Sequence, residues 1–247
     1  MPAYFLLPQV YVCRSGEHVV WLDVRANAYF SCRAQDCETW CALIEGWPCG
    51  HGSEAHRALQ AVQSEADLLR ELATIVTPDR HAGKSAAPLI AKHATHAFVP
   101  PSLDAAVHVP RGFLWQLTLA WMKSWWKVRI GSFESALAGT RPAESALQHS
   151  APLEARLIEA ARCLVAAFCH LKPIFFRGHE HCLLESLTLL ELLRQEGIGA
   201  QLVIGVDTEP FAAHAWAQWG DQVLNDAPER IQRFVPTHLV ERLPNTS

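Results

Sequence analysis

The stretch from Gly178 to Asp226 contains a cysteine, a histidine and an aspartate in an order that suits acyl transfer through a thiol. Cys182 comes first, and His214 and Asp226 follow it. A thiol attacks a carbonyl once a base has taken its proton, and the base acts best when a third group holds its ring in place. We therefore expect Cys182 to be the nucleophile, His214 the base and Asp226 the group that orients the base.

The element that positions Cys182 is predicted to be a helix that begins at this residue. The residues that indicate it share an apolar side chain and helical spacing: Leu183, Leu184, Leu187, Leu190 and Leu193. Gly197 suits the left-handed position after a helix, and the apolar run from Ile198 to Val206 predicts a buried strand. A thiol in the first turn of a helix lies at the positive end of the helix dipole, where free N–H groups can also bind an oxyanion.

A hairpin is predicted to bring the histidine and the aspartate together. Two strands, at residues 213–218 and 222–226, flank a turn at Gly220. A turn centred on Gly220 places His214 directly opposite Asp226 and on the same face of the sheet. A shift of the register by one residue would put the two side chains on opposite faces.

Each of these three residues also has an ordinary structural explanation. A buried cysteine often serves as a small core residue, a histidine in a strand is often a satisfied core residue, and an aspartate near a strand end is often a cap. The combination favours catalysis, because a cysteine at a helix start is followed by a histidine and an aspartate in one hairpin.

The same stretch resembles a known family over one contiguous segment. The carriers are Cys182 with the following LLESLTLLELLRQEGIGAQLVIGV, then PFAAHAWAQ, then VLND. They resemble the transglutaminase-like cysteine peptidase of lasso-peptide biosynthesis, the B2 protein. The resemblance implies that Cys182, His214 and Asp226 form a catalytic triad. His179, Glu180 and His181 lie outside the family's pattern, and their role is open.

The N-terminal part predicts a small winged-helix-like domain. Three strands, at residues 9–14, 18–23 and 28–32, precede three helical patterns at residues 36–45, 53–62 and 66–75. The double hairpin and the motif LDVRANAYFSC resemble the PqqD-like precursor-recognition domain, B1, of peptide-modifying enzymes. The resemblance implies that a leader peptide adds a strand along Tyr29 and Ser31 and packs against Leu69 and Leu72. The alternative is that these four side chains belong to the core.

Residues 81–110 are rich in proline and alanine and are predicted to link residues 1–80 to a peptidase domain at residues 111–247. The tryptophan-rich helix from Phe113 to Val128 is expected to pack on the body of that domain, although it could also line a substrate groove. A second helix, from Leu153 to Leu171, leads toward Cys182. We therefore expect an α+β protein with a recognition domain and a transglutaminase-like domain.

Composition excludes several classes of protein. The net charge of −4 offers no attraction for nucleic acid, so a nucleic-acid-binding protein is not expected. Charged residues interrupt every long apolar stretch, so no membrane span is expected either. The start of the sequence does not resemble a signal peptide, so a cytoplasmic protein is expected. Its cysteines are then expected to be reduced. The cysteines between Cys32 and Cys49 lack the paired spacing of zinc sites, and Gly83-Lys84-Ser85 is only half of a phosphate loop, so neither metal nor cofactor is expected.

The two resemblances together imply a leader peptidase of lasso-peptide maturation. The resemblance implies that it binds the precursor's leader and hydrolyses the bond between leader and core, so that a cyclase of the asparagine-synthetase-like type can close the ring. Two alternatives stay open. The same triad could transfer an acyl group to an amine, or the protein could be a non-catalytic adaptor that presents the precursor to the cyclase.

Overall fold

The structure is a computed structural model that describes residues 4–35, 41, 44–47, 74–86, 94–98, 107, 109–131, 133–138, 151–176 and 181–239. The chain forms two compact units. Unit 1 comprises Met1–Ile90 and Val206–Ala212, and unit 2 comprises Ala91–Gly205 and Ala213–Ser247. The short segment Val206–Ala212 is the tip of a hairpin whose strands belong mainly to unit 2.

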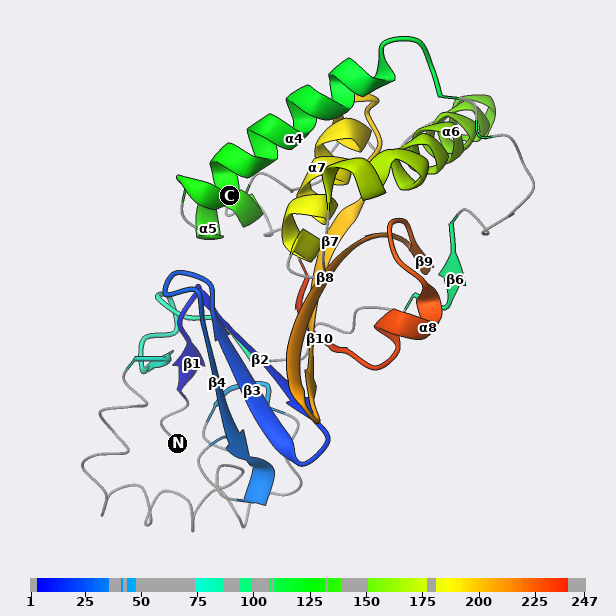
Figure 1. Cartoon of the computed structure of the whole chain (residues 1–247). Helices are drawn as coiled ribbons and strands as arrows, with labels where there is room; N and C mark the ends of the chain where they lie inside the picture. Colours follow the sequence, from blue (N-terminus) through cyan, green and yellow to red (C-terminus); the bar gives the residue numbers. More distant parts are fainter. Residues whose placement is uncertain are drawn as a thin grey trace, which may run out of the picture. The chain divides into compact units, whose positions relative to one another are not determined.

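Unit 1 is built on antiparallel strands (Figure 1). Its three-stranded sheet has the order β2-β3-β4, with bounds Val10–Ser15, His18–Asp23 and Ala28–Arg33. A second pair joins β1, Phe5–Leu6, to β5, Val76–Thr77. The buried core of this unit is one cluster of mainly aliphatic side chains and one tryptophan: Leu6, Val10, Val12, Val19, Trp21, Ala34, Cys41, Ile44, Val76 and Ala86. The three strands therefore agree with the sequence pattern to within one residue at each end.

Other expectations for unit 1 have different outcomes. The helices expected at residues 36–45, 53–62 and 66–75 lie almost entirely outside the described residues, as do Leu69 and Leu72. Cys32 is disulfide-bonded, contrary to the expectation that the cysteines are reduced. The hairpin tip contributes to this unit, because the hydroxyl of Thr208 lies 3.4 Å from that of Ser15 and the ring of Phe211 packs edge-on against Tyr29.

Unit 2 combines helices with a five-stranded sheet of order β10-β7-β8-β9-β6. The strands are β6 (His96–Ala97), β7 (Gln201–Thr208), β8 (Phe211–Trp219), β9 (Gln222–Val223) and β10 (Val235–Leu239). The helices are α4 (Phe113–Arg129), α5 (Phe133–Ala138), α6 (Ala151–Phe175), α7 (Cys182–Gln195) and α8 (Pro228–Ile231). β6 falls in the expected linker and pairs in parallel with β9, so part of this stretch belongs to the sheet.

Helix α7 is the centre of unit 2 and lies between α4 and α6 (Figure 1). Its last turn ends as the sequence predicts: Gly197 has a φ of 75°, and the N–H of Ile198 donates to the carbonyl of Leu193 at 2.9 Å. Nine of its residues are buried, six of them leucines, so the helix is anchored on nearly every side. The helix therefore offers a fixed support for a functional group at its first residue.

Close packing also fixes β8, the strand that carries His214, against β7. A Cβ atom at Gly205 would lie 2.9 Å from the ring of Trp216 and 2.9 Å from the Cβ of Phe234, so only glycine fits there. Trp216 is 1% exposed and belongs to β8. β8 is thus held against β7 at the part of the strand that carries His214.

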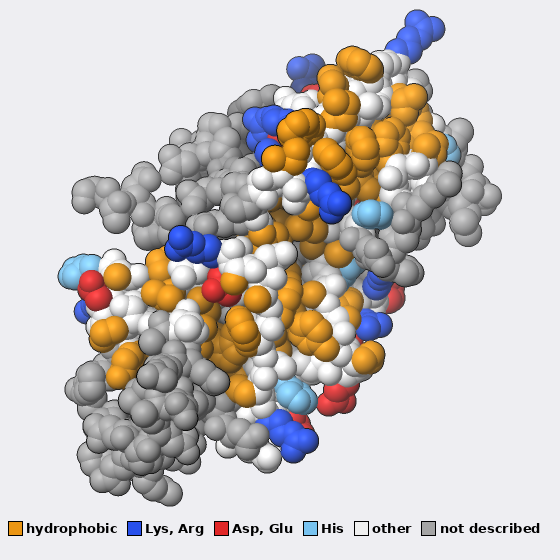
Figure 2. Space-filling view, turned by 60° about the vertical axis from the view of Figure 1, so that its left-hand side comes forward, with side chains coloured by type: hydrophobic (Ala, Val, Ile, Leu, Met, Phe, Trp, Pro, Cys, Tyr) orange, Lys and Arg blue, Asp and Glu red, His pale blue; other side chains and the backbone are white. Residues whose placement is uncertain are grey.

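Two tryptophans of α4 lie largely outside the core. The side chains that α4 buries include Phe113, Leu117 and Ala120, whereas Trp115 is 67% exposed and Trp126 is 56% exposed. Figure 2 shows hydrophobic side chains gathered on the surface of the helical part of this unit. The helix itself packs on α7. Within the described residues, no helix is both long and apolar enough to cross a membrane.

Candidate active site

Cys182 is the first residue of α7, and its thiol is free and partly exposed. The sulfur accepts hydrogen bonds from the backbone N–H groups of Ala215 and Leu183. One donor belongs to the strand β8 and the other to the first turn of the helix. Both contacts, together with the positive end of the helix dipole, favour a negative charge on the sulfur.

His214 lies in the middle of β8 and is 7% exposed. Its Nε2 atom is 2.5 Å from Oδ2 of Asp226, which leaves Nδ1 for the thiol, and the imidazole is hydrogen-bonded to Cys182. The rings of Trp216 and Phe234 flank the imidazole, with centroids 6.2 Å and 5.1 Å from it. The structure thus brings the three predicted residues into one hydrogen-bonded chain, from sulfur to imidazole to carboxylate.

The hairpin that joins them differs from the predicted one. The pairs across its turn are Gln218 with Val223 and Trp219 with Gln222. This register is one residue away from the predicted one and, if continued, would place Asp226 opposite Ala215 and on the other face from His214. β9 ends at Val223, however, and the chain then bends so that Asp226 reaches His214 from beyond the strand. The predicted direct cross-strand pairing is therefore wrong, although the two side chains do meet.

The three groups change one another's proton affinity. Burial lowers the pKa of His214, but the hydrogen bonds to Asp226 and Cys182 outweigh burial and raise that pKa to about 9. Burial raises the pKa of the Cys182 thiol, yet the hydrogen bond with His214 and those from the backbone bring it below its ordinary value. Burial likewise raises the pKa of Asp226, and its hydrogen bonds to His214 and to the N–H of Ala227 bring it below the usual range. The shifts of the thiol and of the imidazole both favour the ion pair of thiolate and imidazolium over the neutral pair.

This arrangement can carry out covalent acyl transfer. A thiolate is the reactive form of cysteine, and an imidazolium beside it can give a proton to a leaving amine. The carboxylate of Asp226 holds the ring through Nε2 and stabilises its positive charge. Within the described part of the chain, no three histidine, cysteine or acidic side chains are grouped as metal ligands.

The predicted leader-binding residues fall in unit 1. Tyr29 and Ser31 belong to β4, which is an edge strand of the described three-stranded sheet. Ser31 is exposed, whereas Tyr29 is half-buried and its ring contacts Phe211. Leu69 and Leu72 lie outside the described residues.

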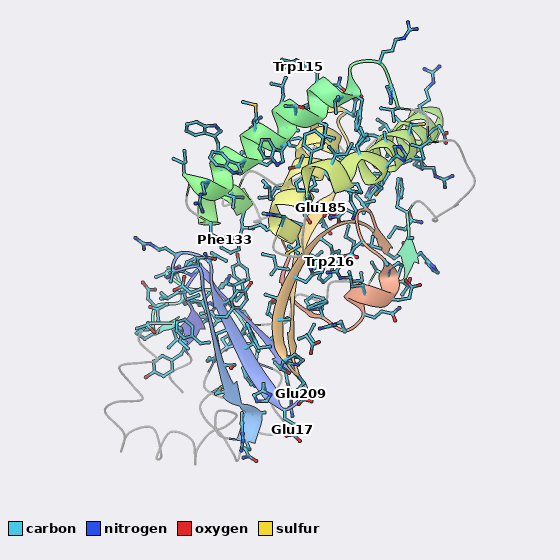
Figure 3. All side chains as sticks on the ribbon, viewed as in Figure 1. Glu17, Trp115, Phe133, Glu185, Glu209 and Trp216 are labelled. Carbon is cyan, nitrogen blue, oxygen red and sulfur yellow. The ribbon has the colours of Figure 1, made fainter. Side chains whose placement is uncertain are left out.

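The sequence analysis missed a set of polar residues beside the triad. Hydrogen bonds connect these residues in one network: Lys172, Glu185, Ser186 and Asn225. Figure 3 shows Glu185 on α7 and Trp216 on β8, the two elements that this network joins. Two of these residues could have been found from their positions in the sequence. Asn225 directly precedes Asp226, and Ser186 lies one helical turn after Cys182.

Comparisons with known proteins found a family and a relative that the chain resembles. Residues 116–238 match the Transglutaminase-like superfamily. A segment of 47 residues is 51% identical to the Microcin J25-processing protein McjB of Escherichia coli and covers 19% of this chain and 23% of that protein. The match therefore spans less than a quarter of the relative's length. No solved structure matches the chain. The superfamily match and the relative together support the resemblance to the lasso-peptide B proteins.

Proposed function

We propose that this chain, which carries a transglutaminase-like domain and resembles the lasso-peptide B proteins, is the leader peptidase of a lasso-peptide pathway. It hydrolyses the peptide bond between the leader and the core of a precursor. The observation that carries the proposal is the hydrogen-bonded chain from Cys182 through His214 to Asp226, whose pKa shifts favour an ion pair of thiolate and imidazolium.

The proposed reaction has two halves. The Cys182 thiolate attacks the carbonyl of the last leader residue, and the tetrahedral intermediate expels the amine of the core, which takes the proton from His214. The leader is then held as a thioester on the sulfur. Neutral His214 next takes a proton from water as the water attacks the thioester. The thiolate leaves, which restores the ion pair, and the leader's new carboxylic acid loses its proton to solvent. The freed amine of the core is the group that a partner cyclase needs for ring closure.

We further propose that unit 1 holds the leader. β4 lies at the edge of the described sheet, with Ser31 exposed and Tyr29 at its start, so an extended peptide can add to the sheet there through backbone hydrogen bonds. Leu69 and Leu72 remain proposed contacts from the sequence. The core peptide would then be presented to the triad by a tethered leader, which raises its effective concentration.

Acyl transfer to an amine is the alternative that the same chemistry permits, because the thioester can be attacked by an amine instead of water. Product analysis decides between them. The chain is incubated with a lasso precursor in water enriched in oxygen-18, with and without an added primary amine, and the products are weighed by mass spectrometry. We expect a free core and a leader whose new carboxylate carries one heavy oxygen, at a yield that the amine leaves unchanged. A leader recovered mainly as its amine adduct would reject hydrolysis and favour transfer.

A further inference from the structure

A single amide side chain ends the β8–β9 ladder next to the triad. In the observed register Ala217 and Leu224 face each other, and the N–H of Leu224 donates to the carbonyl of Ala217 at 2.9 Å. The reciprocal bond is replaced: the N–H of Ala217 donates to Oδ1 of Asn225 at 2.8 Å. The side chain of Asn225 thus occupies the place of the next backbone acceptor, and regular pairing stops.

The other end of the same amide is bound to the helix that carries the thiol. Nδ2 of Asn225 donates to Oε1 of Glu185 at 3.0 Å and to the hydroxyl of Ser186 at 3.1 Å. That hydroxyl lies 2.8 Å from the carbonyl of Cys182 and 3.1 Å from the carbonyl of Ala215. Asn225 is 4% exposed and has every hydrogen-bonding atom of its amide satisfied, so its position is fixed from both sides.

A lysine from a third element completes the network. Nζ of Lys172, on α6, donates to Oε1 of Glu185 at 3.0 Å and to the backbone carbonyl of Asn225 at 2.7 Å. The lysine therefore holds the main chain of Asn225 and balances the charge of Glu185. A half-buried carboxylate that receives both an ammonium and an amide is a firm anchor for the loop.

We propose that Asn225 is the positioning residue of this site: it stops the β8–β9 ladder and fastens the loop to α7, and thereby sets Asp226 against His214. The inference accounts for the contact between Asp226 and His214 in a register that would otherwise separate them. The effect of Asn225 on catalysis rests on the proposed function, whereas its hydrogen bonds are features of the fold and do not depend on that function. Glu185, Ser186 and Lys172 act through Asn225 in this scheme.

The test begins with Asn225→Ala in the full chain. Without the amide, Ala217 can pair with the backbone of Leu224, and the ladder can extend toward Asp226. We expect kcat for leader cleavage to fall about 100-fold with KM nearly unchanged, the scale of loss that a misplaced catalytic group causes. Gln218→Ala is the matched control: it removes another buried amide of the same hairpin, whose partners are Trp216 and Gly220, and should leave kcat near that of the parent.

A second readout does not require the precursor. The rate at which iodoacetamide alkylates Cys182 below neutral pH reports the thiolate fraction, and we expect about a tenfold loss in Asn225→Ala, because each unit of thiol pKa changes that fraction tenfold. Gln218→Ala should keep the parent's rate. A chain that fails to cleave any leader but shows this loss would reject the proposed peptidase and retain the positioning role.

An exchange of donor and acceptor gives an independent check. Asn225→Asp alone places a second carboxylate beside Glu185, and we expect it to lose as much kcat as Asn225→Ala. With Glu185→Gln added, the amide at position 185 can donate to the carboxylate at position 225, so the hydrogen bond is restored in the opposite direction. We expect kcat to recover at least about tenfold over the single change. The proposal is overturned if a folded Asn225→Ala keeps the parent's kcat and alkylation rate. Should that variant not fold, a double change that is no better than Asn225→Asp overturns it.

Discussion

Cys182→Ala is expected to abolish release of the leader, with a fall in rate on the order of 10⁴-fold or more, which is the loss that removal of the nucleophile causes in triad enzymes. Binding of the precursor should be almost unchanged, because the proposed leader site lies on β4 and not at the thiol. Mass spectrometry of leader and core measures cleavage, and titration calorimetry with the precursor measures binding.

The matched control for this change is Cys163→Ala. Cys163 is an exposed cysteine of α6, and its sulfur lies 4.0 Å from the carboxylate of Glu159. The control should cleave and bind as the parent does. Cleavage by Cys182→Ala at the parent's rate would reject the covalent mechanism. Loss of binding together with cleavage would show that Cys182 is a structural part of the precursor site, and would favour the adaptor.

Asp226→Asn is expected to reduce cleavage by about 10⁴-fold, the loss that this change of the orienting carboxylate causes in a triad. The amide keeps the size of the side chain but removes the charge that raises the pKa of His214. The parent's kcat/KM should fall as pH rises through about 9, where the imidazolium loses its proton. In the variant this alkaline fall should begin at lower pH, since the raising effect of the carboxylate is gone.

The control for the aspartate is Asp221→Asn in the turn of the same hairpin. Asp221 is exposed, and its backbone carbonyl accepts from the N–H groups of Thr95 and His96, which the change leaves in place. It should retain the parent's rate and pH profile. If Asp226→Asn lowers the rate without moving the alkaline limb, the carboxylate does not act through the imidazole.

The elements that carry strong periodic patterns were predictable from the sequence. The helix that begins at Cys182 and ends before Gly197 follows from leucine spacing and from one residue that tolerates a positive φ. The strands β2 to β4 follow from alternation between tight turns. Each of these signals is local, because a hydrogen bond or a turn within a few residues decides the outcome.

The exact turn and the side chain that interrupts the strand pair were not predictable from the sequence. Gly220 and Asp221 form a two-residue turn instead of a turn centred on Gly220, which moved the register by one. The prediction still placed His214 beside Asp226, but for the wrong reason: Asn225 takes a ladder hydrogen bond and the chain leaves the sheet. The rule that predicts strand pairs assumes hydrogen bonds between backbone groups alone, so it does not foresee a side chain that takes one of them.

The tryptophans of α4 show a second limit. Large aromatic residues usually add to a core, yet Trp115 and Trp126 are mainly exposed, whereas Leu117 and Ala120 are buried. Periodicity identifies a helix, but the face that it buries depends on the shape of the neighbouring helix. The sequence therefore identifies the helix, but its tryptophans do not reveal which face is buried.

The central claim is that Cys182 is a thiolate because His214, held by Asp226, faces it, and the pH dependence of Cys182 alkylation tests this most directly. The parent and His214→Ala are treated with iodoacetamide at several pH values, and the modified peptides are mapped so that Cys182 is followed apart from the other cysteines. We expect the parent's Cys182 to react well below the ordinary thiol pKa of about 8.5, and His214→Ala to lose this reactivity at low pH. A parent whose Cys182 reacts only as pH approaches that ordinary value, with the same profile in His214→Ala, would contradict the account.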